Sequence, residues 1–414
     1  MSRRGTFAAI DVGTTKVCTI VGDADRDGGP RVLGVGVVPS SGLTKGMVEN
    51  IHDATEAIRV SVEKAERSSG QRVTSAHVGI AGAHISSLNN RGIAAIADRD
   101  HAISNDDVDR ALDGARGLSI PTNREVLHVI PRYYVVDGQD NVSDPVGMYG
   151  QRLDVETHII TGAVSAMRNL TKCVEGAGIE VDALVLEPLA SAEAVLLDEE
   201  RRQGVVLVDI GGGTTDVGIF VDGSVFHTAV IPVGGYHLTH DLVVGLRVPF
   251  DSAEAAKAQY GNALPSNVRA DEMIDLDAFG GDGRMHVHRQ RLCEILQART
   301  EEILEMVLTE VHRAGYDEMV SAGLVLTGGS SNLTGIADLA RQVLNMPVRI
   351  GMPSGVYGLV ETISNPAYAT SVGLLHWAMR DGGQYTHPAQ VGPRMAMPEW
   401  MKGFRKLIRG FLPE

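Results

Sequence analysis

The sequence predicts a two-domain α/β fold in which two similar halves enclose one cleft. The first observation is Val205 to Phe220, VVLVDIGGGTTDVGIF, where two apolar strands flank a glycine-rich turn. The second is that Ala8 to Gly22, AAIDVGTTKVCTIVG, repeats this pattern near the N-terminus. The third is another glycine-rich turn, Leu324 to Gly329, late in the chain. Duplication of the turns in this order favours two α/β halves that close on a ligand from both sides.

Both hairpin turns suit an anion. Glycines remove every Cβ, so backbone N–H groups can approach an anion closely and the chain can accept positive φ. Threonines beside the glycines add hydroxyl donors. The residues are Gly13, Thr14, Thr15 and Lys16 in the first turn and Gly211, Gly212, Gly213, Thr214 and Thr215 in the second. Taken alone, either segment can also be interpreted as a glycine-rich hairpin without a ligand.

A carboxylate, Asp11 or Asp209, ends the strand before each turn, where it suits a water-mediated metal contact better than a phosphate contact. With its three turns in this order, the chain resembles the superfamily of actin, Hsp70 and the sugar kinases. The resemblance implies an actin-like two-domain fold of duplicated βββαβα halves, with ATP or ADP bound between the hairpins. It also implies Mg²⁺ held by Asp11 and Asp209 through water, because this ion keeps several water ligands. The sequence leaves the rate of ATP hydrolysis open.

Composition restricts the class of protein. The chain has 414 residues, more than one ordinary domain, and 43% hydrophobic with 4% aromatic residues predicts an aliphatic core. The net charge of −15 argues against nucleic acid as a partner, since a general nucleic-acid binder presents a basic face. Cys18, Cys173 and Cys293 form no CxxC pair, which favours buried thiols in a reducing cytoplasm. We find no signal-peptide core and no segment of about twenty strongly apolar residues that could span a bilayer.

The first half continues with a strand, a helix and another strand. Arg31 to Pro39 is predicted as the third strand. Asp53 is predicted to cap the next helix, with Glu56 closing a capping box and the helix running to Arg67. Val73 to Ala81 is the strand that follows.

Residues 84–162 are predicted to form an inserted small α+β subdomain. A short helix from Asp106 to Gly117 precedes an aliphatic strand from Arg124 to Val136 and a charged, glycine-rich hairpin. The passage REVLHVIPRYYVVDGQ, followed by DPVGMYGQRLDVETHIITG, resembles the insertion of the FtsA family, the bacterial cell-division homologues of actin. Its glycines can be loop residues without a ligand, so we interpret the segment as a contact surface for subunits or partners.

A helix from Ser165 to Ala177 and a strand from Glu180 to Leu186 lead to the first helix predicted to connect the halves. Pro188 suits the first turn of that helix because it lacks an N–H that would be unpaired there. Glu187 is the candidate catalytic residue, which the resemblance places where a carboxylate orients water toward the terminal phosphate. A helix-end carboxylate stabilised by the helix dipole is the alternative.

The second half carries further candidates for nucleotide contact. Gly234 and Gly235 precede a helix and resemble the superfamily loop that closes over the phosphates. Glu254 and Lys257 lie three residues apart on one helical face. They resemble the pair that borders ribose and adenine in the bacterial actins, and a solvated ion pair is the alternative.

A polar, Gly/Asp-rich segment at 262–287 is predicted as a strand-poor surface module, followed by a long helix from Arg289 to Gly315. Arg299 on that helix is the candidate contact for an acidic-apolar peptide. The resemblance to the FtsA family implies that this peptide is the C-terminal tail of the tubulin-like FtsZ. The alternative is that the basic residues of the helix only form a solvated face. His286 and His288 alternate two apart, which is not the ligand spacing of a helix, so no metal site is predicted there.

In the third turn, Gly328 and Gly329 would let the backbone pass flat against a purine. Pro366 to Leu375 resembles the second connecting helix, with small residues where two domains approach closely. The predicted divisions are 1–83, 163–200 and about 360–380 for the first domain, 84–162 for the insert, 201–240 and 305–359 for the second domain, and 241–304 for its smaller subdomain. A linker at 381–397 and a terminal helix at 398–414 complete them.

The last segment is predicted to be an amphipathic helix that lies on a membrane surface. An apolar stripe faces one side and cations face the other, which suits lipid tails and anionic headgroups. The stripe is Trp400, Met401, Phe404, Leu407, Ile408, Phe411 and Leu412, and the cations are Lys402, Arg405, Lys406 and Arg409. A helix docked on the protein's own core is the alternative.

The resemblance to the FtsA family covers nearly the whole chain. It implies a protein on the cytoplasmic face of the cell membrane, at the division septum, that polymerises with itself. The partners it implies are the FtsZ tail, anionic lipid and later division proteins. Another actin-like scaffold, of the pilus-assembly or rod-shape type, is the nearest alternative. A sugar-type kinase would have no use for the terminal helix, and an Hsp70-type ATPase would need a substrate domain after the ATPase.

Overall fold

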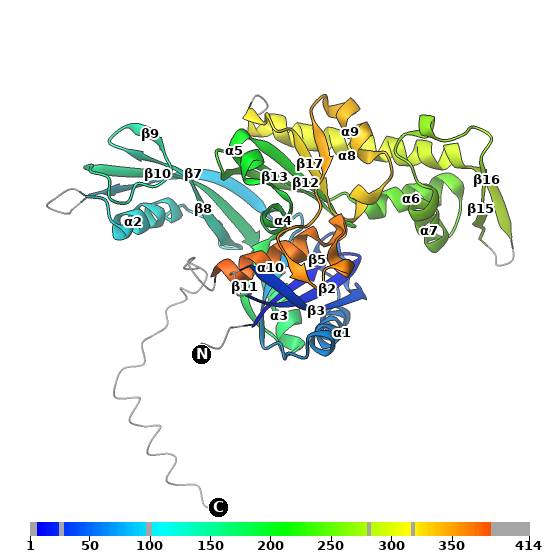
Figure 1. Ribbon diagram of the computed structural model, residues 1–414, viewed down its shortest axis with the longest axis horizontal. Helices are drawn as coiled ribbons and strands as arrows, with labels where there is room; N and C mark the ends of the chain where they lie inside the picture. The colour runs from blue at the N-terminus through cyan, green and yellow to red at the C-terminus, as the bar shows by residue number, and fades with distance from the viewer. Residues whose placement is uncertain (1–5, 25–28, 97–101, 280–282, 316–318, 382–414) are drawn as a thin grey trace, which may run out of the picture.

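The computed structural model describes residues 6–24, 29–96, 102–279, 283–315 and 319–381, and two sheets organise it (Figure 1). The order is β11-β6-β1-β2-β3-β19 in the first sheet and β14-β13-β12-β17-β18 in the second. In each, an antiparallel meander of three consecutive strands continues into parallel strands that come later in the chain. The predicted duplication of the two halves is therefore confirmed.

The strands of the two sheets follow the apolar runs of the sequence. Those of the first sheet are β1 (Thr6–Val12), β2 (Lys16–Ala24), β3 (Pro30–Pro39), β6 (Ser75–Ile80), β11 (Glu180–Leu186) and β19 (Tyr357–Gly358). Those of the second are β12 (Val205–Ile210), β13 (Thr215–Val221), β14 (Ser224–Ile231), β17 (Leu324–Thr327) and β18 (Val348–Ile350). Every residue of β12 and β13 is buried, as expected for strands covered on both faces.

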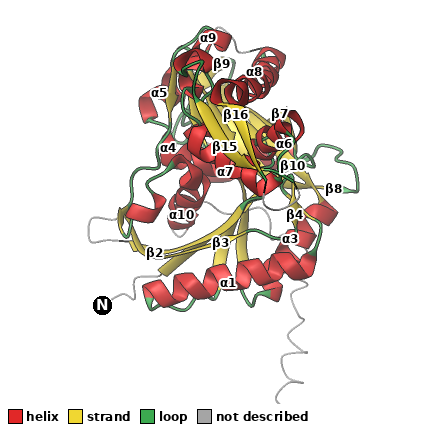
Figure 2. Ribbon diagram, turned by 90° about the vertical axis from the view of Figure 1, so that its right-hand side faces the viewer, coloured by secondary structure: helices red, strands yellow, loops and turns green. Residues whose placement is uncertain are grey.

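Two helices, α4 (Glu187–Val195) and α10 (Ala369–Asp381), pack against each other between the two sheets (Figure 2). They touch most closely at Gly373, where an added Cβ would lie 1.7 Å from the carbonyl oxygen of Ala190. Small residues at this crossing were predicted, and they let the two backbones approach. Pro188 lies in the first turn of α4, as predicted.

Helices α1 (Ile51–Ser69) and α3 (Val164–Gly176) cover the outer face of the first sheet (Figure 2). The predicted cap of α1 was wrong, because Asn50 accepts the N–H groups of His52 and Asp53 and thus begins the helix. Asp53 lies three residues after this cap, and its carboxylate accepts a hydrogen bond from Asn50 Nδ2 at 2.7 Å.

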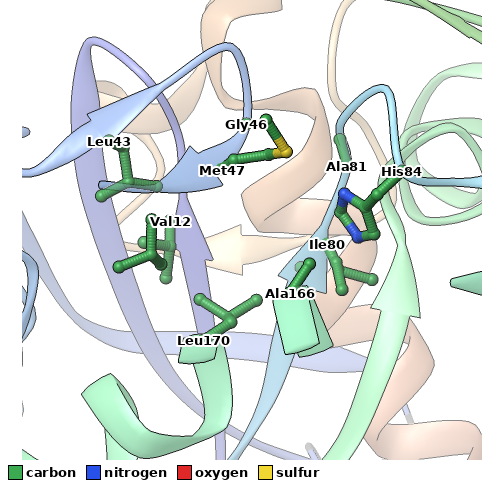
Figure 3. Close-up of a pocket in the computed structure, with 11 residues that line it drawn as sticks. Val12, Leu43, Gly46, Met47, Ile80, Ala81, His84, Ala166 and Leu170 are labelled. Carbon is green, nitrogen blue, oxygen red and sulfur yellow. The ribbon is translucent and has the colours of Figure 1, made fainter. Parts of the chain in front are cut away.

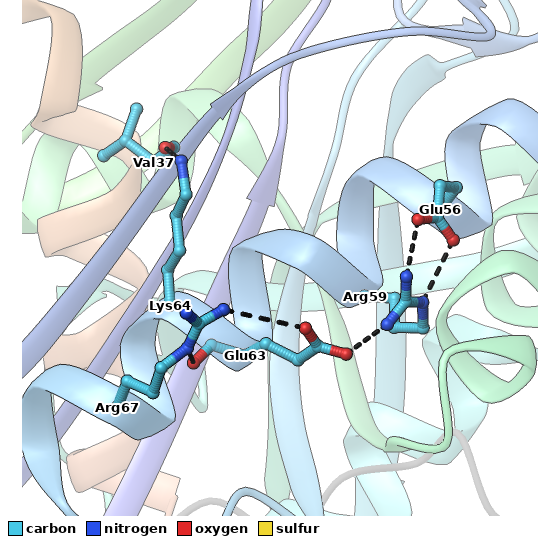
Figure 4. A network of polar contacts seen from close by, with 6 residues as sticks. All are labelled: Val37, Glu56, Arg59, Glu63, Lys64 and Arg67. Carbon is cyan, nitrogen blue, oxygen red and sulfur yellow. Dashed lines mark hydrogen bonds and ion pairs between the residues drawn. The ribbon is translucent and has the colours of Figure 1, made fainter.

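The outer face of α1 carries a network of charged side chains (Figure 4). Arg59 bonds both Glu56 and Glu63, and Lys64 Nζ donates to the carbonyl oxygen of Val37 in β3 at 3.1 Å. These exposed pairs keep the face polar and contribute little to stability. The opposite face of α1 buries small and aliphatic residues against the sheet.

The insert between β6 and α3 forms a sheet of its own with the order β7-β10-β8-β9. Its elements are β7 (Ser86–Ala95), α2 (Asn105–Arg116), β8 (Arg124–Val136), β9 (Gln139–Val142) and β10 (Arg152–Ala163). The predicted inserted α+β subdomain is thus confirmed. Its sheet docks on β14 of the second half, where Ser87 Oγ donates to the carbonyl oxygen of Thr228 at 2.8 Å.

The second half is completed by further helices. They are α5 (Asp198–Gln203), α6 (Gly235–Leu246), α7 (Phe250–Tyr260), α8 (Arg289–Ala314) and α9 (Ile336–Leu344). Short 3₁₀ turns lie at η1 (Pro265–Asn267), η3 (Gly329–Asn332), η4 (Glu361–Ile363) and η5 (Pro366–Tyr368). Helices α6 and α7 and part of α8 surround a small core of their own, on the side of the second half away from the insert (Figure 1).

The prediction of a strand-poor module at 262–287 was wrong. Strands β15 (Met273–Asp277) and β16 (Arg284–His288) form an antiparallel hairpin there. Ile274 and Leu276 are buried and alternate with exposed residues, which is the period of a strand with one covered face. His286 and His288 lie on β16, and their two-residue spacing is the period of that strand.

The predicted linker and terminal amphipathic helix lie outside the described residues, apart from Asp381 at the end of α10. None of the helices in the described part of the chain combines the length and apolar character needed to cross a bilayer.

Candidate functional site

The turns of the two hairpins meet in a cleft between the halves. Each turn closes in the same way, since Gly13 N donates to the Lys16 carbonyl at 3.0 Å and Gly211 N to the Thr214 carbonyl at 2.9 Å. Between them lies a cavity of about 140 Å³. The duplicated sequence pattern thus becomes a duplicated backbone geometry around one space.

Glycines of the second turn touch threonines of the first. A Cβ added to Gly212 would lie 2.3 Å from Thr15 Cγ2, and one added to Gly213 would lie 2.6 Å from Thr14 Oγ1. Real Cβ atoms do not approach other atoms so closely. The absence of side chains at these glycines therefore allows the halves to close on each other.

The two strand-end carboxylates are held by the connecting helices. Ser371 of α10 donates to Asp11 Oδ2 at 2.7 Å. Asp209 Oδ2 accepts from Ser191 of α4 at 2.6 Å and from Thr370 of α10 at 3.1 Å. Helices α4 and α10 therefore fix each acid against the floor of the cleft, and the unbonded oxygens remain available.

Three buried acids, Asp11, Asp209 and Asp216, and the half-buried Glu187 make this site strongly electronegative. Burial raises the pKa of Asp11 and of Asp209 above the usual range, against the hydrogen bonds just described. Burial and then the charges of Asp216, Asp11 and Asp209 raise the pKa of Glu187 well above its usual value. Burial and the charge of Asp209 raise the pKa of Asp216 to about 8.

One cation, Lys16, lines this cleft beside the acids. Its Nζ donates to the carbonyl oxygen of Ala367 and lies 4.9 Å from the centre of the Tyr368 ring. Asp216 Oδ1 is buried without a hydrogen-bond partner among the described residues. The four acids thus outnumber this lysine, and a bound cation would supply the missing positive charge.

These observations test whether the implied Mg·ATP fits. Bare glycine backbones and the hydroxyl of Thr14 suit a phosphate chain, and surplus carboxylates suit a hydrated divalent cation. The residues present therefore fit the group. In the described residues no three His, Cys, Asp or Glu side chains are arranged to hold an ion directly, and the water-mediated contact stays a prediction.

Most of the residues predicted to contact the nucleotide or the metal line the cleft. They are Asp11, Gly13, Thr14, Thr15, Lys16, Glu187, Asp209, Gly211, Gly212, Gly213, Thr214, Gly328 and Gly329. Thr215 does not, because its hydroxyl donates to the carbonyl oxygen of Val233 at 2.8 Å and the residue is fully buried. Alternation along β13 turns the side chain of Thr215 away from the cleft, whereas Thr214 stays in the turn.

Gly234 and Gly235 lie against the second turn rather than over the cavity. Gly235 N donates to the Gly211 carbonyl at 2.9 Å, and Tyr236 N donates to the Gly212 carbonyl at 2.7 Å. The first N–H groups of α6 thereby hold the turn in place. A Cβ on Gly234 would lie within 2.9 Å of three carbonyl oxygens of this turn, so no side chain fits there.

Glu254 and Lys257 form the predicted pair on α7. Lys257 Nζ lies 2.7 Å from both Glu254 Oε2 and Thr239 Oγ1, and 3.1 Å from the carbonyl oxygen of Gly235. The pair is thus joined to α6 and is more than a solvated ion pair on one helix. Neither residue lines the cleft, and their contact with a nucleotide stays a prediction.

The third turn reaches the floor of the cleft. Gly328 has a φ of +86°, and a Cβ there would lie 2.2 Å from Asp209 Oδ1. Both the conformation and the space require glycine. Gly328 therefore brings the third turn directly beside the acid that ends β12.

Sequence reasoning missed several residues that line the cleft: Val12, Gly46, Ala81, Ala367 and Thr370. Gly46 belongs to a short hairpin of β4 (Leu43–Thr44) and β5 (Met47–Val48). Beneath it a second cavity, of about 10 Å³, separates Leu43 and Met47 from Ile80 and His84 (Figure 3). The sequence gives only a weak sign of this hairpin, because Gly46 suits a two-residue turn but Lys45 is not one of the residues that such a turn prefers at its first position.

Arg299 is engaged within the chain. Its guanidinium forms two hydrogen bonds with Asp241 of α6, at 2.6 and 3.1 Å, and also bonds Glu302. These acids raise the pKa of Arg299. A peptide carboxylate would compete with Asp241 for this side chain.

The fold and cleft define an actin-like protein of two duplicated α/β halves. Among solved structures, a PilM–PilN type IV pilus biogenesis complex matches with a TM-score of 0.65 at 15% identity, covering 91% of this chain and 99% of the other. MreB5 of Spiroplasma citri bound to ADP matches with a TM-score of 0.55 at 14% identity, covering 92% and 97%. At these identities the likeness concerns the fold.

The chain belongs to the FtsA family of cell division proteins. It matches the family "Cell division protein FtsA" over residues 206–373 and "SHS2 domain inserted in FTSA" over residues 82–161. It is 44% identical to the cell division protein FtsA of Pseudomonas aeruginosa, over 96% of this chain and 97% of that protein. It is 40% identical to FtsA of Neisseria meningitidis (92% and 92%) and 34% identical to FtsA of Escherichia coli K12 (98% and 98%).

Proposed function

We propose that this chain is an ATP-binding cytoskeletal protein that polymerises on the cytoplasmic face of the cell membrane and tethers the FtsZ ring during division. The observation that carries the proposal is the cleft where two duplicated glycine hairpins meet beside four acidic side chains. Membership of the FtsA family supplies the cell-division context. The structural relative MreB5, whose solved structure contains ADP, supports a nucleotide as the ligand of this fold.

Different residues of the cleft would bind the phosphates and the Mg²⁺. Thr14, Thr15 and Lys16 would contact phosphates from the first half, and the glycines at 211–213 with Thr214 from the second. Asp11 and Asp209 would hold Mg²⁺ through water, an ion that neutralises charge on the phosphate chain when it is bound. Ser371, Ser191 and Thr370 keep these two acids in position.

Glu187 is the proposed catalytic residue for hydrolysis. Its carboxylate lines the cleft at the N-terminus of α4, and it would accept a hydrogen bond from the attacking water and orient it. Burial and then the neighbouring acids raise its pKa, so added positive charge in the cleft would favour the ionised form that can accept this bond. Hydrolysis then rests on positioning and charge neutralisation, without a covalent intermediate.

The partners follow from the outer parts of the chain. The insert, proposed as the domain 84–162, would contact neighbouring subunits or later division proteins. The subdomain at 241–304, with Arg299, would bind the FtsZ tail, and residues 398–414 would bind anionic lipid. Pilus assembly is the competing function, because the PilM complex shares the fold, but the FtsA relatives span almost the whole chain at 34–44% identity.

Vesicle flotation tests the membrane part of the proposal. Trp400→Glu with Phe404→Glu removes two large apolar side chains from the stripe, and we expect the protein to leave anionic vesicles while it still binds ATP. The matched control is Leu197→Glu with Leu359→Glu, which changes two apolar residues that are 60% and 54% exposed on the folded part. If the stripe variant floats as well as the control does, membrane tethering by this helix is wrong.

A further inference from the structure

The hairpin of β4 and β5 carries a lysine into contact with the opposite half of the molecule. Its two-residue turn is Lys45-Gly46. A Cβ added to Gly213 would lie 3.0 Å from Lys45 Cα and 3.1 Å from Lys45 N. Gly46 N donates to Thr14 Oγ1 at 3.3 Å. The turn therefore touches both phosphate hairpins at once.

The backbone at Lys45 is unfavourable for a lysine. Its φ is +50°, and Gly46 follows with a φ of +74°. A two-residue turn with both φ values positive prefers Asn, Asp or Gly at its first position. Of the six non-glycine residues with positive φ in the described chain, four are Asp or Asn, and the others are Lys45 and Arg247. A lysine at this point thus has a conformational cost that Asn, Asp or Gly would avoid, and the turn itself gains nothing from the lysine.

Gly46 of this turn lines the same cleft as Glu187. A Cβ on Gly46 would lie 2.9 Å from the carbonyl oxygen of Ala81, and one on Gly79, two residues earlier, would lie 3.6 Å from Glu187 Cγ. The turn also adjoins Thr14 and Gly213, which are both proposed to contact phosphates. A phosphate of the nucleotide is therefore the anion expected beside Lys45, and Glu187 in the same cleft is proposed to act at the terminal one.

The surroundings of Lys45 leave its charge available. The side chain is exposed, and no ion pair of Lys45 occurs among the described residues. Its positive charge acts on the N-terminal turn of α6. Burial is the main cause that lowers the pKa of His237 there, and the charge of Lys45 is the next. His237 Nδ1 accepts from Gly234 N at 3.1 Å, so this imidazole belongs to the helix end that braces the second turn.

We propose that Lys45 binds the terminal phosphate of a nucleoside triphosphate and so makes the cleft prefer the triphosphate over the diphosphate. The lysine reaches from the first half across the second, and its contact forms when the two halves are closed. This inference rests on the proposed function, since it assigns a residue to the same nucleotide site. A lysine that merely closes a surface turn is the alternative.

Calorimetric affinities for AMPPNP and ADP, in the presence of Mg²⁺, test the assignment. Lys45→Gly removes the ammonium and suits the positive φ, so the variant should fold with an unchanged or higher melting temperature without nucleotide. We expect AMPPNP binding to weaken about tenfold or more and ADP binding less than about threefold, since a lost charged hydrogen bond has an effect of this order. Lys45→Arg keeps the charge and should lose less than Lys45→Gly.

Arg247→Gly is the matched control. This substitution also removes a cation from a residue with positive φ, and Arg247 lies at the other end of α6. We expect its AMPPNP-to-ADP affinity ratio to equal that of the wild type. An unchanged ratio in Lys45→Gly, or an equal change in Arg247→Gly, overturns the assignment of Lys45. If the wild type itself binds neither nucleotide, the proposed function fails, which is a distinguishable result.

If Lys45→Gly lowers the melting temperature, Lys45→Asn provides the second variant, because Asn also tolerates positive φ. The rise in melting temperature caused by AMPPNP gives a readout that is independent of turnover. It should shrink in both Lys45 variants and persist in Arg247→Gly. A full rise in both Lys45 variants contradicts the proposal.

Discussion

Gly212 of the second hairpin packs against the methyl group of Thr15 of the first, where a Cβ on Gly212 would come within 2.3 Å of Thr15 Cγ2. The two halves of the molecule thus meet at a point where even one carbon atom has no room. This contact sets how far the cleft can close.

Gly212→Ala should therefore hold the cleft partly open. We expect ATP binding to weaken by about 5- to 150-fold, because the overlap costs roughly 1–3 kcal/mol when the halves close. Isothermal calorimetry measures the affinity. Gly117→Ala in the insert is the control, since its Cβ would meet its nearest neighbour, the Gly114 carbonyl oxygen, at an ordinary 3.4 Å. Wild-type affinity in a folded Gly212→Ala protein would show that closure at this contact is not needed for binding.

Glu187→Gln should separate binding from hydrolysis. It removes a carboxylate from a cleft with surplus negative charge, so we expect ATP to bind at least as tightly while phosphate release slows by about tenfold or more. Glu175→Gln, an exposed position on α3, is the control. Turnover equal to that of the wild type would reduce Glu187 to a helix-end carboxylate.

The same variant has a pH signature without nucleotide. The raised pKa of Glu187 means that the folded protein binds more protons than the unfolded chain above pH 4.5, so stability falls as the pH rises above that value. Glu187→Gln removes this contribution. The melting temperature should then fall less between pH 5 and pH 8 than it does in the wild type. An identical fall in both proteins would contradict the raised pKa.

His158 should make the contact between the insert and β14 sensitive to acid. Its Nε2 lies 3.0 Å from Thr228 Oγ1 and its Nδ1 lies 2.7 Å from Asn89 Oδ1. Burial, followed by the charges of His227, Arg132 and His128, lowers its pKa to about 3. The unfolded chain therefore binds the extra proton below pH 6.5, and stability falls as the pH decreases toward 3.

Between pH 7 and pH 5, His158 should cost about 2 kcal/mol of unfolding free energy. Urea unfolding at the two pH values measures this loss, and His158→Gln should show a loss smaller by that amount. His52→Gln, at an exposed site on α1, serves as the control. Equal losses in His158→Gln and the wild type would show that His158 does not titrate with this pKa.

Arg299 calls for a charge swap, because it already pairs with Asp241. Arg299→Glu alone should lower the unfolding free energy by about 1 kcal/mol and weaken binding of an FtsZ tail peptide. Asp241→Arg with Arg299→Glu restores the ion pair and its stability. If the swap also restores peptide binding in an anisotropy titration, Arg299 has a structural role and does not contact the peptide.

The duplicated hairpins could be predicted because their chemistry is local. Each places an acid, glycines and threonines within one turn, and repetition in the chain gave the pairing of the halves. The connecting helices were predictable for a similar reason, since α4 begins with Glu187-Pro188 and α10 carries small residues at its crossing. Which residues hold Asp11 and Asp209 could not be predicted, because Ser371 and Ser191 come from distant parts of the chain.

Errors arose where two local signals competed. Asn50 and Asp53 can both cap a helix, and the structure uses the first as the cap and the second as its partner. The strands β15 and β16 were hidden by their polar residues, although Ile274 and Leu276 alternate as a half-covered strand does. Thr215 was assigned to phosphate with Thr214, but the strand period turns adjacent side chains in opposite directions.

Ser87 and His158 of the insert both contact Thr228, and Thr228 pairs with Gly218 on the strand that starts at the second hairpin turn. The insert is connected in the chain to the first half and docks on the second half, so it bridges the two. Moving the halves apart would therefore strain the contacts of the insert with Thr228. Because linkage is reciprocal, a protein that binds the docked insert would then strengthen the binding of a ligand that favours the closed cleft, by the same factor in each direction.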